Sequence, residues 1–451
     1  MTDKQSPLTH KARAQLIERI LGRKSPEAAG AENASANAAC AAAWRAAAAR
    51  PPVPEAFTRF DRHPGYEKMR IPQAAAKRLG LDNPFFKVHE GVAGAQTRIA
   101  GRDYLNYSSY NYLALSGHPQ VNQAAHEAIE RYGTSAGASR LVAGERPVQR
   151  ELEQALAQLY GVQDCAVFVS GHATNVSTIA CLFGPKDLVL HDSLIHNSVL
   201  QGIQLSGATR RAFAHNDLAA LEQLLLQLRG QFERVLIVVE GVYSMDGDSP
   251  DLAALVALKR RHQAFLMVDE AHALGVLGAT GRGLHEHCGV AGAQVDIWMG
   301  TLSKTLAGCG GYIAGEHALI ELLKYSAAGF VYSVGISPPL AAASLAALRL
   351  MLAEPWRVAA LRERSGQFLR LAQARGLDTG LSQGHCVVPL VAGSSLKATR
   401  LAAALFERGI NVQPIIHPAV EEKAARLRFF LSCAHTAQQI EHTIATLEEL
   451  V

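Results

Sequence analysis

The sequence lacks the features that mark membrane-spanning, secreted and zinc-binding proteins. No apolar stretch approaches the roughly 20 residues that a membrane helix needs, and charged residues recur throughout the first 25 positions. The seven cysteines are widely scattered, without the paired spacing of a zinc site or a disulfide framework. These absences predict a cytoplasmic protein with free thiols, no membrane span and no metal.

Signals of nucleic-acid and nucleotide binding are also missing. The formal charge is only +4 over 451 residues, without a strongly basic block, so nucleic acid is not a predicted partner. The sequence has no GxxxxGK motif and no strand-associated GxGxxG motif with its downstream acid. It also has no repeat of fixed period, which excludes solenoids and propellers. A phosphate site in this chain would therefore hold something other than a nucleotide.

The N-terminal 55 residues differ in composition from the rest of the chain. Residues 8–21 place apolar side chains at helical spacing, which predicts one amphipathic helix. From 25 to 50 alanine dominates, and Pro51, Pro52 and Pro54 close the stretch, as in a linker. We therefore expect a helix and linker over 1–55 and an N-terminal segment over 56–110.

The pattern beyond residue 110 predicts an α/β fold. Over 111–352, short apolar runs alternate with helical stretches, which indicates a large domain with a mostly parallel, doubly wound sheet. The runs are CAVFV at 165, DLVLHD at 187, RVLIVVEG at 234, AFLMVDEAH at 264, VDIWMG at 295 and GGYIAG at 310. Candidate strands at 385 and 425 and helices near 395–408 and 436–450 then predict a smaller α+β domain over 353–451.

Several polar residues follow these predicted strands directly, where open α/β sheets bind their ligands. They are His196, Asp269 with His272 three residues later, and Lys304. The segment SGHATN at 170–175 lies between a strand and a helix, so the amides of Gly171 and His172 could bind a phosphate. Taken singly, Asp269 would more commonly be a helix cap or an ion-pair partner.

Together these residues match the needs of pyridoxal phosphate, which are a phosphate cradle, an amine, a carboxylate and an aromatic plane. Lys304 would form the Schiff base, and Asp269 would hold the pyridine nitrogen protonated. His196 would stack on the ring, and His272 would reach its phenolic oxygen. The hypothesis is a pyridoxal-phosphate enzyme.

The sequence from about 100 to 450 resembles the α-oxoamine synthase family of fold-type I pyridoxal-phosphate enzymes. The motifs are NYSSYNYLAL at 106, GTSAGASRLVAGE at 133, SGHATN at 170, HDSLIHNS at 191, EGVYSMDGD at 240, VDEAHALGVLG at 268, GTLSK at 300 and ARLRFF at 425. The resemblance implies a seven-stranded sheet and a homodimer, for which 106–144 is the candidate segment shared between chains. It also implies the four roles above, with Ser244 and Thr301 completing the cofactor shell.

The same resemblance implies the substrate-binding residues. Arg426 matches the arginine expected to bind a substrate carboxylate, with Arg428 as a rival, because period-two alternation places both on one side of a strand. Tyr110 stands where many relatives have Asn, and with Asn111 it gives the form SYNYL. That form resembles serine palmitoyltransferases and members of polyketide-type pathways.

The family reaction is a decarboxylative Claisen condensation of a small amino acid with an acyl thioester. The resemblance therefore implies glycine, L-alanine or L-serine as one partner, and an acyl group carried by coenzyme A or an acyl carrier protein as the other. The alternatives are an aminotransferase or aldol-type lyase of the same fold, or a non-catalytic scaffold subunit of a serine palmitoyltransferase-like complex. The N-terminal helix is expected to recruit a carrier partner or to dock on the enzyme body.

Overall fold

The computed structural model describes residues 53–78 and 80–451. The described chain divides into two units, one that ends at Gly80 and one that spans Leu81–Val451. The predicted helix at 8–21 and linker at 25–50 lie outside the described residues. The described part of the first unit comprises η2 (Glu55–Phe57), η3 (Phe60–Arg62) and α3 (Pro64–Arg78). Every helix in the described part of the chain is too short or too polar to cross a bilayer.

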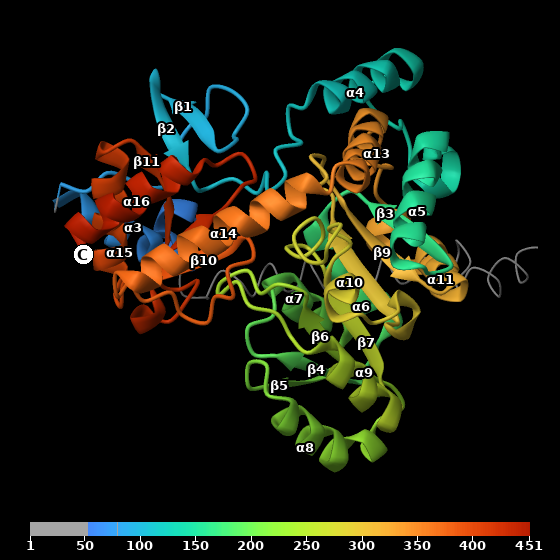
Figure 1. Cartoon of the computed structure of the whole chain (residues 1–451). Coiled ribbons are helices and arrows are strands. Elements are labelled where there is room, and N and C mark those ends of the chain that lie inside the picture. The colour runs from blue at the N-terminus through green and yellow to red at the C-terminus, as the bar shows by residue number, and fades with distance from the viewer. Residues whose placement is uncertain (1–52, 79) are drawn as a thin grey trace, which may run out of the picture. The chain divides into compact units, whose positions relative to one another are not determined.

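The second unit is built on a seven-stranded sheet with the order β3-β9-β8-β7-β6-β4-β5, most of whose strands are labelled in Figure 1. Only β9 runs antiparallel to its two neighbours. The predicted mostly parallel, doubly wound sheet is therefore confirmed. The strands are β3 (Asp164–Phe168), β4 (Leu188–Asp192), β5 (Thr209–Phe213), β6 (Val235–Glu240), β7 (Phe265–Asp269), β8 (Ile297–Thr301) and β9 (Gly311–Gly315).

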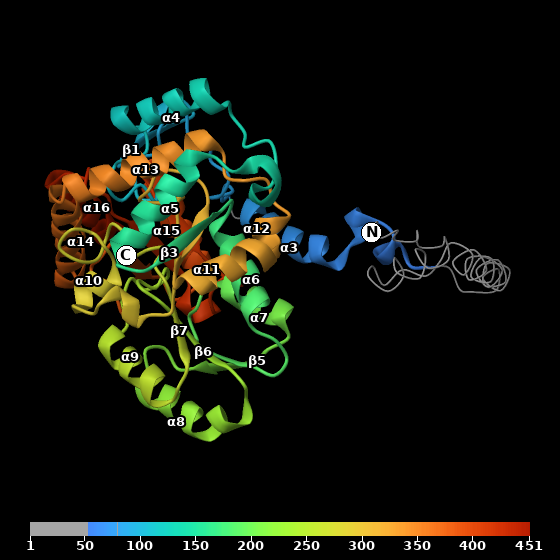
Figure 2. The same cartoon turned by 90° about the vertical axis from the view of Figure 1, so that its right-hand side faces the viewer.

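Helices cover both faces of this sheet, as Figures 1 and 2 show. Alternate side chains of one strand therefore enter two separate cores: Trp298 packs in one, and Ile297 and Met299 pack in the other. Strands buried on both faces read as continuous apolar runs, as β6 does. The helices are α4 (Pro119–Tyr132), α5 (Pro147–Tyr160), α6 (Gly171–Leu182), α7 (Asn197–Ser206), α8 (Leu218–Leu228), α9 (Leu252–Arg261), α10 (Leu284–Cys288), α11 (His317–Ser326), α12 (Ala328–Val331) and α13 (Pro338–Ala353).

The C-terminal part forms the predicted smaller α+β domain around an antiparallel sheet of order β10-β13-β12. The two predicted strands and both predicted helices are present, and α14 precedes them. The elements are α14 (Trp356–Ala374), β10 (Val387–Val391), α15 (Ser395–Glu407), β11 (Ile410–Asn411), β12 (Gln413–Ile415), β13 (Arg426–Phe430) and α16 (Ala437–Leu450).

A third sheet joins residues from opposite ends of the second unit. The hairpin β1 (Gln96–Ile99) and β2 (Arg102–Asn106) pairs through β2 with β11 in parallel. The chain that follows β2 is held by further backbone hydrogen bonds to the C-terminal domain. Tyr107 N donates to Asn411 O, Phe430 N donates to Tyr107 O, and Cys433 N donates to Tyr112 O. The segment with the NYSSYNYLAL motif is thus anchored by the C-terminal domain.

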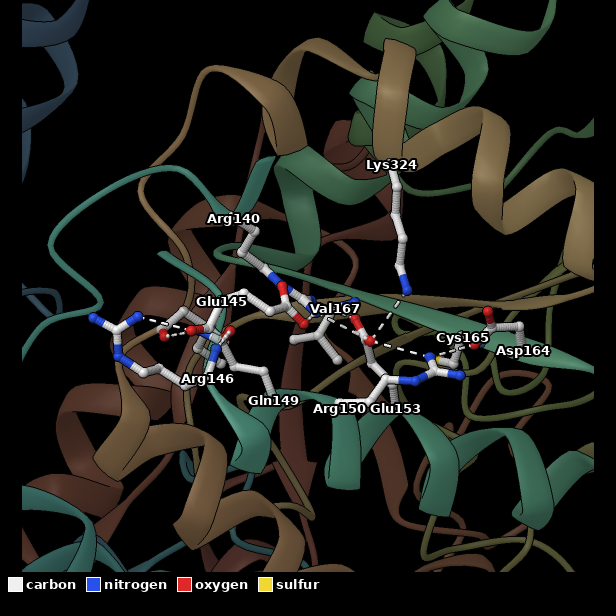
Figure 3. A network of polar contacts seen from close by, with 11 residues as sticks. Arg140, Glu145, Arg146, Gln149, Arg150, Glu153, Asp164, Cys165, Val167 and Lys324 are labelled. Atoms are coloured by element: carbon white, nitrogen blue, oxygen red, sulfur yellow. Dashed lines mark hydrogen bonds and ion pairs between the residues drawn. The ribbon is translucent and has the colours of Figure 1, made fainter. Parts of the chain in front are cut away.

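A buried ion network, shown in Figure 3, fixes the segment with the GTSAGASRLVAGE motif to the edge of the large sheet. The fully buried carboxylate of Glu153, on α5, pairs with Arg140 and Lys324 and accepts a hydrogen bond from Val167 N of β3 at 2.9 Å. Arg140 begins the π-helix η4 (Arg140–Gly144) and also pairs with Glu145 at 2.6 Å. Because a buried charge needs its partners, this network specifies the position of η4.

Candidate active site

A cavity of about 380 Å³ opens at the carboxyl ends of β6, β7 and β8, beside the first turns of α6 and α7. This is the position at which doubly wound sheets bind ligands. Nine of the predicted site residues line it: Tyr110, Gly171, His172, His196, Ser244, Asp269, His272, Thr301 and Lys304. Among the described residues, no cluster of three potential metal ligands is found.

Lys304 lies in the loop after β8, and its surroundings favour a neutral amine. Burial lowers the pKa of Lys304 to about 8, although the carboxylates of Asp269 and Glu240 oppose the shift. Its Nζ lies 5.3 Å from the centre of the Tyr110 ring. A lysine in this state can act as a nucleophile or as a base.

Asp269 ends β7 and is 4% exposed. Its Oδ2 accepts a hydrogen bond from Asn175 Nδ2 at 2.9 Å, and its Oδ1 accepts one from Ala271 N at 2.9 Å. Asn175 Nδ2 also donates to Ser198 Oγ at 2.9 Å. These bonds hold the carboxylate in one orientation at the cavity wall.

His196 is the N-cap of α7. Its Nδ1 lies 2.7 Å from Ser198 Oγ, so the Asn175 and Ser198 side chains connect this imidazole to Asp269. Burial lowers the pKa of His196, and the charge of Asp269 partly opposes that effect. The ring centre of His172 lies 6.5 Å from that of His196. The ring of His196 is thereby fixed as one wall of the cavity.

His272 is held between Tyr112 and Phe430. Its Nδ1 lies 2.7 Å from the Tyr112 hydroxyl, and its ring is nearly parallel to Phe430, with centres 6.2 Å apart. Burial, followed by the positive charges of Lys304 and Arg428, lowers the pKa of His272 well below its usual value. The imidazole is therefore neutral at physiological pH.

The first turn of α6 provides an anion site. The helix begins at Gly171, and the Ser170 side chain caps it by accepting a hydrogen bond from Ala173 N at 3.3 Å. A Cβ at Gly171 would lie 3.0 Å from Thr301 Oγ1, so a larger residue there would require the Thr301 side chain to shift. The positive end of the helix and the hydroxyls of Thr301 and Ser244 can bind a phosphate.

The two arginines of β13 have different surroundings. Arg428 lines the cavity, and its Nη1 donates to Ser244 O at 2.9 Å while its buried Nε has no partner in the described part of the chain. Arg426 is not among the lining residues. Its guanidinium pairs with Asp246 at 2.7 Å and donates to Met245 O at 3.1 Å.

Asn111 is also away from the cavity. Its side chain closes a turn by donating to Ser116 O at 3.3 Å and accepting from Ser116 N at 3.1 Å. Tyr110, by contrast, is 40% exposed and packs edge-on against Phe430 and His272 at the cavity wall. The structure therefore brings Tyr110, and not Asn111, to the site.

Sequence reasoning missed several lining residues, of which Glu240 is the most unusual. It ends β6 directly beside Asp269, is 3% exposed, and its Oε1 has no hydrogen-bond partner among the described residues. Burial, reinforced by the charge of Asp269, raises the pKa of Glu240 to about 8. Its position after the apolar run VLIVV was the available signal, the same one that marked Asp269.

His215, outside the cavity, ties two of its loops together. Its Nδ1 lies 2.9 Å from Asp192 at the end of β4, and its Nε2 lies 2.8 Å from Asp248 in the loop that carries Ser244. Asp192 also accepts a hydrogen bond from Leu194 N in the turn before His196. Since both ring nitrogens face carboxylates, the ring must carry two protons.

The residues present fit pyridoxal phosphate. The cavity combines an anion site at Gly171, an amine with a lowered pKa at Lys304, and an oriented carboxylate at Asp269. The buried Nε of Arg428 and Oε1 of Glu240 have no protein partners in the described chain and remain available to bound groups.

Comparisons with known proteins agree with this site. The family Aminotransferase class I and II matches residues 102–447. An 8-amino-7-oxononanoate synthase of Geobacter sulfurreducens is 42% identical over 364 residues, which cover 80% of this chain and 92% of that protein. A serine palmitoyltransferase solved with pyridoxal phosphate as an internal aldimine has a TM-score of 0.82 at 28% identity, over 86% of this chain and 97% of that one. The 8-amino-7-oxononanoate synthase of Francisella tularensis has a TM-score of 0.67 at 26% identity, over 77% and 97%.

These matches and the fold define an enzyme of the class I and II aminotransferase type. Within that class, the chain belongs to the α-oxoamine synthase family of fold-type I pyridoxal-phosphate enzymes. The predicted family and fold are confirmed.

Proposed function

We propose that this chain is a pyridoxal-phosphate-dependent acyltransferase that condenses a small amino acid with an acyl thioester. A carbon–carbon bond forms between the α-carbon of the amino acid and the acyl carbonyl carbon. The carboxylate leaves as carbon dioxide and the thiol is released, which gives an α-amino ketone. The observation that carries the proposal is one cavity holding Lys304, Asp269 and Arg428, in a chain whose relatives include 8-amino-7-oxononanoate synthases.

The proposed cofactor contacts are those that the family resemblance implies, and they are supported by the positions of the side chains around the cavity. Lys304 Nζ would bond the cofactor covalently, Asp269 would face the pyridine nitrogen, and His196 would lie against the ring. His272 would contact the phenolic oxygen. The phosphate would be bound by four residues, Gly171, His172, Ser244 and Thr301. When bound, pyridoxal phosphate supplies an electron sink for the negative charge that develops at the α-carbon.

Lys304 is the residue that moves the proton. With a pKa of about 8, its amine is neutral in a useful fraction of molecules near physiological pH. Nζ would take the proton from the α-carbon and later return one to the product. The bond between Asp269 and Asn175 keeps the carboxylate turned toward the cavity throughout.

Arg428, rather than Arg426, is proposed to bind the carboxylate of the amino acid. Arg428 lines the cavity and its Nε is free, whereas the guanidinium of Arg426 is already paired with Asp246. A planar guanidinium can bind a carboxylate through two parallel hydrogen bonds. Tyr110, beside Lys304, would contact the substrate side chain or the acyl group.

Four further features belong to the proposal. The acyl donor is carried by coenzyme A or an acyl carrier protein, and the amino acid is glycine, L-alanine or L-serine. The enzyme is a homodimer, supported by exposed apolar side chains at Val142, Tyr332 and Val334 near the GTSAGASRLVAGE segment. A cytoplasmic location is supported by the free cysteines of the described chain.

The test is an assay of the purified holoenzyme with each of the three amino acids and a series of acyl thioesters on both carriers. Thiol release is followed with a thiol reagent, and the product is identified by mass spectrometry. Thiol and carbon dioxide are expected only when both substrates are present, and neither is expected from Lys304→Ala. Formation of a keto acid without a thioester, cleavage of a β-hydroxy amino acid, or no turnover with any pair would contradict the proposal.

A further inference from the structure

Tyr112 and His272 form a buried pair at the edge of the cavity. Tyr112 is fully buried, and its hydroxyl lies 2.7 Å from His272 Nδ1. His272 lines the cavity, and its other nitrogen, Nε2, makes no hydrogen bond within the described part of the chain. Which nitrogen carries the ring proton decides whether this ring donates to a bound cofactor or accepts from it.

The direction of the hydrogen bond depends on two protons, the hydroxyl proton of Tyr112 and the ring proton of His272. Burial raises the pKa of Tyr112 well above its usual value, so the hydroxyl keeps its proton. Burial and the nearby positive charges keep the His272 ring neutral, so it carries a single proton. Either Tyr112 donates to Nδ1 and the ring proton is on Nε2, or Nδ1 donates to Tyr112 and the tyrosine proton must find another acceptor.

The surroundings decide between these arrangements. Apart from His272, the Tyr112 hydroxyl has no hydrogen-bond partner among the described residues that meets ordinary geometry. The thiol of Cys386 lies next to it, but sulfur is a weak acceptor, and Cys386 Sγ is 3.7 Å from His272 O, to which it donates. A proton on Nδ1 would therefore leave a buried hydroxyl without a good acceptor, which is unfavourable.

We propose that Tyr112 is a positioning residue that fixes the tautomer of His272 with its proton on Nε2. The ring then donates from Nε2 into the cavity, toward the phenolic oxygen of the cofactor. The nearly parallel Phe430 ring holds the plane of the imidazole. The inference rests on the pyridoxal phosphate of the proposed function and not on the choice of amino acid or thioester.

The test is a spectroscopic pH titration of the holoenzyme without substrate, so it is independent of the condensation reaction. The variants are Tyr112→Phe, His272→Asn and the double variant. Tyr107→Phe is the matched control, because Tyr107 is equally buried and its hydroxyl bonds Thr443 at 2.9 Å, away from the cavity. Loss of a donor leaves more negative charge on the phenolic oxygen, so the visible absorption band should titrate at higher pH.

His272→Asn is expected to raise the titration midpoint by about one pH unit. Tyr112→Phe is expected to raise it by less, since the released ring samples both tautomers, and Tyr107→Phe to leave it unchanged. The double variant is expected to match His272→Asn. A Tyr112→Phe midpoint equal to wild type, or a double-variant shift equal to the sum of the single shifts, would overturn the inference.

A second measurement does not depend on the folding of Tyr112→Phe. The holoenzyme is labelled with ¹⁵N-histidine, and the His272 signals are identified by their loss in His272→Asn. The expected result is a protonated Nε2 and an unprotonated Nδ1. A protonated Nδ1 would overturn the inference whatever the activity of the enzyme.

Discussion

Replacing His215 with glutamine tests whether a protonated histidine, paired with two carboxylates, holds the cavity loops together. Burial by itself would lower the pKa of His215, but its hydrogen bonds to Asp192 and Asp248 outweigh burial and raise it to about 10. A histidine whose pKa is higher in the folded state stabilises that state most below its unfolded value of 6.5. This stabilisation is lost as the pH rises from 6.5 through 10.

The free energy of folding that protonated His215 contributes follows from the interval between these two pKa values. At about 1.4 kcal/mol for each pH unit, this interval corresponds to at most about 5 kcal/mol of stability below pH 6.5. The ring is 12% exposed, and solvent screening reduces this to about 2 to 3 kcal/mol. For a chain of this length, the entropy of unfolding converts that loss to roughly 2 to 3 °C in melting temperature.

The assay compares melting temperatures of wild type and His215→Gln from pH 6 to 10. The difference in melting temperature is expected to be largest at pH 6 to 6.5 and to disappear as the pH approaches 10. His126→Gln is the control, because His126 is exposed on α4 and should show no gap. A gap that stays constant or widens with pH would refute a protonated clamp. Loosened loops should also weaken cofactor binding, since they carry His196 and Ser244.

Four further experiments test the site and the N-terminal segment. Asp269→Asn is expected to keep some cofactor but lose orders of magnitude in kcat, because a neutral amide cannot stabilise a pyridinium; near-normal turnover would exclude that role. Borohydride should trap the cofactor on Lys304, and peptide mapping to another lysine would contradict the assignment. Arg428→Lys is expected to raise KM for the amino acid about 10- to 100-fold by loss of bidentate pairing, whereas Arg426→Lys should mainly lower stability; the reverse pattern would favour Arg426. A chain that starts at residue 55 is expected to keep its melting temperature and its rate with a small acyl-coenzyme A thioester, but to slow with an acyl-carrier substrate. Equal losses with both donors and a lower melting temperature would indicate docking of residues 8–21 on the enzyme.

The strands that the sequence predicts are those whose stability comes from burial. β6 and β4 are buried along their whole length, and each opens with an unbroken apolar run, VLIVV in β6 and LVL in β4. β5 escaped prediction because it is the edge strand of the sheet and its TRRA residues are largely exposed. β11 has only two residues, and it is a strand because β2 pairs with it, which no local pattern reveals.

The site residues also divide into those that a local sequence pattern predicts and those whose position depends on partners distant in the sequence. Asp269 and Lys304 were predictable because parallel strands end at one edge of the sheet. Arg426 and Arg428 share one face of β13, and Asp246, which pairs with Arg426 alone, lies 180 residues earlier in the chain, so no local pattern could rank the two arginines. Asn175 was missed for a similar reason, because its bond to Asp269 spans 94 residues.

The pairing of β2 with β11 has a consequence for the order of events during protein synthesis. The chain from Leu105 to Tyr112, which carries Tyr110 on the cavity wall, hydrogen-bonds to Gly409, Asn411, Phe430 and Cys433. A nascent chain that does not yet include residue 433 therefore lacks the support of that wall. We expect cofactor capture to await synthesis of residues 409 to 433, and fragments that end before residue 409 to leave β2 as an unpaired edge, open to aggregation.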